Sequence, residues 1–186
     1  GVRRDYRREH PADGPEDFSN GVRCILGFNA GPPFTPSAYN NNMQLFQTAD
    51  YVVILNEMVH DTRVVPLDGR PHLAGVRQWA GDARGHWEGD TLVVETTNFR
   101  ERPAFAQGSE NMRVTERFTR VDEETILYEF TVEDPTMYTQ SWGGEIPIKK
   151  FDAKLFEYAC HEGNYGLENV LRGARAQERE AERTRN

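Results

Sequence analysis

The chain has 186 residues, of which 22 are Lys or Arg and 30 are Asp or Glu, so its formal net charge is −8. This balance argues against general nucleic-acid binding, which requires a basic surface that neutralises phosphates. No apolar run approaches the roughly 20 residues of a membrane-spanning helix, and 37% hydrophobic residues suffice for one core. These values indicate an acidic globular protein without a membrane span.

The first 42 residues show no hydrophobic period. Arginines, prolines and glycines dominate residues 1–21, and residues 27–42 are rich in Gly, Pro and Asn. Such composition is typical of irregular segments and loops. We predict an irregular N-terminal arm followed by a Gly/Pro/Asn-rich loop.

Strand signals begin at residue 43 and continue to residue 160. After the turn dipeptide Gly89-Asp90, Leu92, Val94 and Thr96 alternate with residues of the opposite face. Residues 126, 128, 130 and 132 are all apolar and share one face of a second hairpin. The predicted strands are 43–48, 51–59, 62–67, 84–88, 91–97, 113–121, 125–133, 137–142, 145–150 and 155–160.

Only the C-terminus has helical character, with an apolar stripe at Leu167, Val170 and Leu171 followed by an Arg/Glu/Ala segment. Short strands at regular spacing favour an antiparallel barrel or sandwich. We predict an all-β fold, an antiparallel lipocalin-like barrel or half-barrel over residues 43–160. The irregular arm and loop occupy residues 1–42, and one charged helix occupies residues 161–186.

Two polar groups flank the first strands. Tyr39, Asn41 and Gln44 surround an Asn run whose amides suit sugar hydroxyls, although the same run suits left-handed turns. Glu57, His60 and Arg63 end an apolar strand, where burial moves acid and base pKa values toward neutrality. The alternative for this second group is a turn with a surface ion pair, because residues 57 and 60 of an unbroken strand face opposite ways.

Two further groups lie later in the chain. His72, Trp79, Arg84 and Trp87 combine rings that stack on a ligand with charges that orient it, although Trp residues are equally suited to a barrel core. Near the end of the predicted sheet, Glu157 precedes a His161-Glu162 pair. In a catalytic interpretation Glu57 or His60 is the base, His72 or His161 is the acid, and Arg63 or Arg84 stabilises negative charge.

The cysteines and histidines give no metal motif. The local ligand pairs of zinc sites are absent, so we predict no metal site, and nothing identifies a cofactor. Cys24 and Cys160 are the two cysteines of the chain. Their number alone leaves a disulfide and a pair of buried thiols equally open.

The chain resembles an uncharacterised family of exported proteins abundant in soil bacteria. The resemblance covers residues 24–175 and includes the motifs YNNN, PLDGRPH, GHWEGDTLVVETTNF and EYACHEGNYG. It implies no activity, but it implies an extracellular or periplasmic location and therefore favours a Cys24–Cys160 disulfide. Family members carry an N-terminal signal and a further segment, so we expect this chain to be a processed or truncated form.

Three functions remain open at this point. The first is acid–base catalysis, as a lyase, isomerase or hydrolase, on a small or carbohydrate-like ligand. The second is non-catalytic binding of such a ligand, with Trp79 and Trp87 stacking on it. The third is an extracellular structural subunit that forms a homo-oligomer through its N-terminal arm and C-terminal helix.

Overall fold

The computed structural model describes residues 12–101 and 108–185. The chain divides into two compact units, of which one contains residues 26–158 and all the strands, and the other contains the described parts of residues 1–25 and 159–186. Each unit is described by itself.

The first sheet of the larger unit has three antiparallel strands in the order β1-β2-β3. They are β1 (Met43–Gln47), β2 (Tyr51–Asn56) and β3 (Thr62–Pro66). In β2 the buried residues alternate with partly exposed ones, which is the pattern of a strand that covers a core with one face.

The second sheet has five antiparallel strands in sequence order. They are β4 (Asp82–Glu88), β5 (Thr91–Thr97), β6 (Arg113–Arg120), β7 (Thr125–Glu133) and β8 (Trp142–Lys149). The turn between β4 and β5 contains Gly89 at φ 59°, a left-handed conformation that glycine adopts without steric cost. Both predicted hairpins are confirmed.

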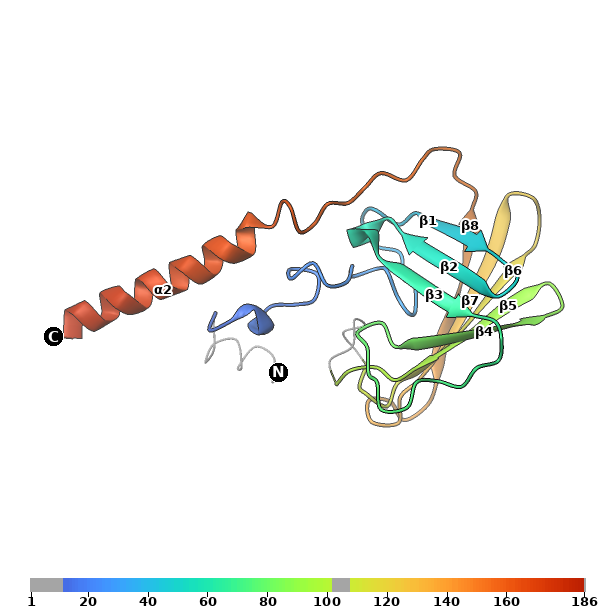
Figure 1. The fold of residues 1–186 in the computed structure, drawn as a ribbon, viewed down its shortest axis with the longest axis horizontal. Coiled ribbons are helices and arrows are strands. Elements are labelled where there is room, and N and C mark those ends of the chain that lie inside the picture. Colours follow the sequence, from blue (N-terminus) through green and yellow to red (C-terminus); the bar gives the residue numbers. More distant parts are fainter. Residues whose placement is uncertain (1–11, 102–107, 186) are drawn as a thin grey trace. The chain divides into compact units, whose positions relative to one another are not determined.

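The two sheets lie against each other in the larger unit (Figure 1), and one hydrophobic core joins them. Ile54 and Val65 of the first sheet and Val94, Val114, Tyr128 and Val132 of the second are fully buried members of it. At the β3–β4 side, Gly85 lets Val65 and Leu67 approach the β4 backbone, since a Cβ there would lie 2.7 Å from Val65 Cγ1.

The sheets do not close into a barrel. Among the described residues, β3 and β4 belong to different sheets and are not paired by hydrogen bonds, and β1 and β8 are edge strands. The prediction of an antiparallel β fold with one C-terminal helix is confirmed. The hydrogen-bonded strand pairs of the described residues do not close the two sheets into a barrel.

Three predicted strand boundaries are wrong. Residues 57–60 leave the sheet because Val59 and His60 have φ of 60° and 55° and form the short 3-10 helix η2 (Met58–His60). Residues 137–141 form a turn after Asp134, and β8 begins at Trp142. Residues 155–160 form no strand.

In the smaller unit, Cys24 and Cys160 form a disulfide with a Cα–Cα distance of 5.6 Å, as predicted. A short 3-10 helix, η1 (Pro15–Asp17), begins this unit, and the long helix α2 (Tyr165–Arg185) ends it. Asn164 accepts a hydrogen bond from the Leu167 N–H and caps α2. Arg175 donates to the carbonyls of Ala12 and Asp13, which fixes α2 to the N-terminal segment.

No helix in residues 12–101 and 108–185 combines the length and the apolar character that membrane crossing requires.

Candidate functional site

Arg63, one of the predicted catalytic residues, lies inside the core. Its guanidinium donates two hydrogen bonds to Glu116, at 2.6 Å and 3.0 Å, and the Tyr128 hydroxyl donates a third to the same carboxylate at 2.8 Å. Burial disfavours the charge of Arg63, but attraction to Glu116 outweighs it and raises the pKa of the guanidinium. Burial, with repulsion from Glu116, raises the pKa of Tyr128 well above its ordinary value. This cluster ties the two sheets together.

Glu57 and His60 form a turn without a shared target. The Glu57 carboxylate accepts a hydrogen bond of 2.8 Å from the Asn42 side chain, and the His60 side chain is exposed. The Asp61 carboxyl is partly enclosed, and burial raises its pKa against the attraction of Arg63. The turn between β2 and β3 is therefore attached to the loop of residues 26–42 by the hydrogen bond between Glu57 and Asn42.

His72 and Arg84 do come together, on the carboxylate of Asp82. Asp82 accepts hydrogen bonds from Arg84 at 2.6 Å and from the Leu73 N–H at 2.8 Å, and lies 3.2 Å from His72 Nδ1. Burial raises the pKa of Asp82, but these hydrogen bonds hold it below the ordinary value. Arg84 also donates to the Pro71 carbonyl, so the group fastens the 70–73 loop to β4.

The remaining predicted residues are dispersed. Trp79 lies under the Arg100 guanidinium at 4.8 Å, and Trp87 is 44% exposed near the end of β4. Tyr39 packs edge-on against Phe28, and Glu157 is exposed. His161 is exposed in the smaller unit.

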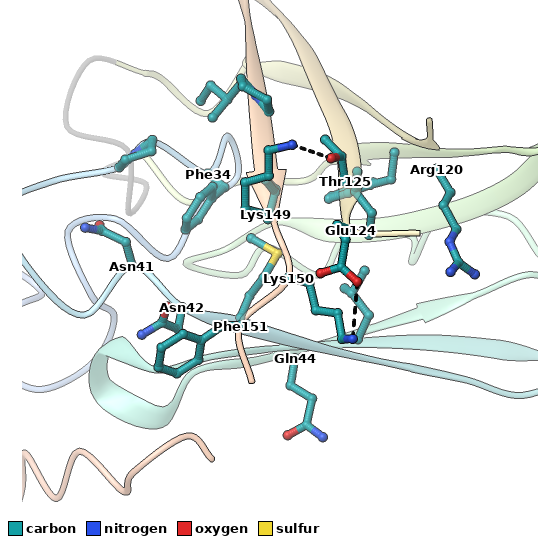
Figure 2. Close-up of a pocket in the computed structure, with 18 of the residues that line it drawn as sticks. Phe34, Asn41, Asn42, Gln44, Arg120, Glu124, Thr125, Lys149, Lys150 and Phe151 are labelled. Carbon is teal, nitrogen blue, oxygen red and sulfur yellow. Dashed lines mark hydrogen bonds and ion pairs between the residues drawn. The ribbon is translucent and has the colours of Figure 1, made fainter. Parts of the chain in front are cut away.

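A cleft of about 920 Å³ lies along β1 and β8 and is the candidate site (Figure 2). Its apolar lining includes Phe34, Leu45, Phe118, Ile126, Ile146 and Ile148. Of the predicted ligand-binding residues, Asn41 and Gln44 line it, and none of the predicted catalytic residues His60, His72 and His161 does. The cleft therefore unites two predicted residues with apolar side chains that were predicted only as parts of strands or, for Phe34, of the loop over residues 27–42.

Charged side chains gather at the β7–β8 end of the cleft. Lys149, Lys150 and Lys154, which are all the lysines of the chain, line it together with Arg120. Lys149 Nζ donates to the Thr125 hydroxyl at 2.6 Å, as Figure 2 shows.

The acidic residues at this end are partly engaged by the chain itself. Asp122 accepts a hydrogen bond from the Glu124 N–H, and this bond, with the attraction of Lys149, lowers its pKa. Glu124 forms an exposed ion pair with Lys150 at 3.4 Å. Charged side chains at this end of the cleft can therefore recognise a ligand. Among the described residues that line the cleft, no close acid–base pair is directed at a buried centre.

Within residues 12–101 and 108–185, no group of three or more His, Cys, Asp or Glu side chains is placed to hold a metal ion.

Comparisons with protein-family models, with curated proteins and with solved structures found no match. The functional argument therefore rests on the geometry of the cleft.

Proposed function

We propose that this chain is a non-catalytic binding protein whose ligand occupies the cleft between β1 and β8. The observation that carries the proposal is the cleft itself, whose volume of about 920 Å³ lies within the ~300–1,000 Å³ typical of ligand sites. We further propose that the two sheets form a lipocalin-like half-barrel, in which a ligand replaces part of the missing wall.

The arrangement of the predicted catalytic groups supports binding over catalysis. A general acid or base must lie within hydrogen-bond reach of the group it serves. Glu57, Arg63 and Arg84 are engaged in structural hydrogen bonds, and the His60 and His161 side chains are exposed. The cleft instead offers an apolar wall with polar groups at its ends, as binding sites do.

The disulfide supports an oxidising compartment, since such bonds persist outside the reducing cytosol. We propose an extracellular or periplasmic location on this ground.

Titration with Nile red, an uncharged dye that fluoresces in apolar sites, tests the cleft. We expect saturable binding to the wild-type chain. Ile146→Glu places a charge on the apolar wall, so the dye affinity should fall by about tenfold or more.

Val64→Glu is the matched control, because Val64 is 55% exposed on β3 and does not line the cleft. This variant should bind the dye as the wild type does. Absence of saturable binding, or equal binding by both variants and the wild type, would refute the assignment of the cleft.

A further inference from the structure

The cleft follows the backbone edges of two strands rather than the face of a sheet. Successive side chains of a strand point to opposite faces. Nevertheless, consecutive residues of β1 (43–45) and of β8 (146–149) line the cleft. The lining therefore includes residues of both orientations, as is expected of a space beside the strand edge, where a neighbouring strand would run.

The hydrogen-bonding groups on the β1 edge can be identified from the ladder. Thr48 N–H donates to Tyr51, and Asn42 accepts from the Glu57 N–H, so the even-numbered residues of this segment pair with β2. In an antiparallel pair the intervening residues point their backbone groups away. The N–H and C=O groups of Met43, Leu45 and Gln47 therefore face the cleft side.

The β8 edge obeys the same rule. Lys150 N–H donates to Glu124, and the register then turns the backbone groups of residues 145, 147 and 149 outward. Residue 147 is a proline, which is tolerated in a sheet where its missing N–H would face an open edge. Pro147 and Lys149 make β8 a poor template for a further strand.

The β1 edge has no such protection. Its sequence, Met-Gln-Leu-Phe-Gln, contains no charge, no proline and no glycine. Natural sheets normally block open edges with charges, prolines or bulges. An unprotected edge beside an apolar cleft is the feature expected of an edge that is paired in the working protein.

We propose that the ligand of this cleft is an extended segment of a partner polypeptide, which adds to β1 as a strand and covers the apolar wall opposite β8. This inference rests on the proposed function and names its ligand class. Backbone hydrogen bonds to residues 43, 45 and 47 supply affinity, and alternate side chains facing the cleft supply specificity.

Charge and space define the partner segment. Arg120 and the three lysines line the β8 end of the cleft beside Asp122, Glu123 and Glu124, which leaves an excess of one positive charge that an acidic residue of the segment would meet. A second copy of the chain fits less well, because each copy repels the other and β8 bounds the cleft on the far side.

A synthetic peptide with the sequence of residues 125–133 is a suitable probe, since its apolar residues alternate with polar ones from residue 128 onward and it carries two glutamates. We expect it to bind the intact chain. Two further versions are N-methylated, each at one of the two alternating sets of residues. At least one of the two methylated peptides should bind about 100-fold more weakly than the parent peptide. It loses roughly three backbone N–H donors, and the loss of each hydrogen bond weakens binding by about tenfold or less.

Amide hydrogen exchange of the protein locates the pairing. On peptide binding, the amides of Met43, Leu45 and Gln47 should exchange more slowly, whereas those of Gln44 and Phe46 are already bonded to β2. Gln47→Pro removes one outward donor and should weaken peptide binding, and Gln47→Ala, which keeps the donor, should not.

The outcomes separate the two proposals. Binding of Nile red without binding of the peptide overturns the strand inference and leaves the cleft as a small-molecule site. Equal affinity of the parent and both methylated peptides also overturns it, as does a chain that is already dimeric through β1 by light scattering and hydrogen exchange. Failure of the dye to bind refutes the proposed function and, with it, this inference.

Discussion

Replacement of Glu116 by Gln is expected to be strongly destabilising. The Arg63 and Glu116 side chains are 4% and 0% exposed, and the guanidinium meets the carboxylate through two hydrogen bonds. Gln keeps the shape of Glu but removes its charge, so the Arg63 cation stays buried without a counter-charge. Breaking such a pair costs about 3–5 kcal/mol, a large part of the ~5–15 kcal/mol that stabilises a typical domain.

The measurement is the free energy of unfolding from urea titrations of wild type and variants. Tyr128→Phe should cost less, about 1–3 kcal/mol, because Glu116 keeps its cation while the Phe34 N–H loses its acceptor. The double variant Arg63→Met with Glu116→Leu should be more stable than Glu116→Gln alone, because it leaves no unpaired charge in the core.

Glu88→Gln is the control. Glu88 pairs with Arg117 at 2.8 Å, but the two side chains are 50% and 39% exposed, so this loss should cost only about 0–1 kcal/mol. If Glu116→Gln cost no more than Glu88→Gln, the claim that the buried cluster holds the sheets together would be wrong.

Three further predictions concern other regions of the chain. Replacing Cys24 and Cys160 together by Ser opens a loop of 136 residues and should lower the free energy of unfolding by about 4–5 kcal/mol in the chain-entropy view, measured against the wild type with and without reductant. Asp61→Asn should stabilise the fold at neutral pH and not at pH values below the ordinary Asp pKa. Because the pKa of Asp61 is raised in the native state, ionisation of its carboxyl lowers the free energy of unfolding of the wild type only as the pH rises. An equal effect at both pH values in urea titrations would contradict this. Glu57→Gln should leave peptide and dye affinity unchanged within about twofold, since the Gln carbonyl still accepts the Asn42 bond; loss of binding in the same titrations would place Glu57 in the site.

Local alternation predicts the second sheet well. Within each of the hairpins β4–β5 and β6–β7, the two strands are joined by a short turn and have clear two-residue periods, so their pairing is nearly fixed by neighbouring sequence. The apolar run from residue 51 predicts too long a strand, because the left-handed residues Val59 and His60 carry no glycine or asparagine signal. Tertiary contacts around Met58, which is 1% exposed, override the local preference there.

The buried ion pair could have been inferred from the alternation of odd and even positions along the strands. Arg63 shares a face with Val65 in β3, and Glu116 shares a face with Val114 and Phe118 in β6. Opposite charges at core-facing positions of two strands indicate a buried pair, whereas proximity in sequence suggested a catalytic group with Glu57 and His60. The cleft has no comparable local signal, because it depends on which strand edges remain unpaired after the chain has folded.

The open edge and the apolar cleft both lie along β1, so the proposed ligand can satisfy both. A closed barrel would bond the backbone groups of residues 43, 45 and 47 and bury the side chains that line the cleft. A small apolar molecule covers the side chains but leaves those backbone groups to water, whereas an added strand serves both. An extended peptide should therefore bind more tightly than a dye that covers the same apolar surface, and the ratio of the two affinities measures the contribution of the β1 backbone.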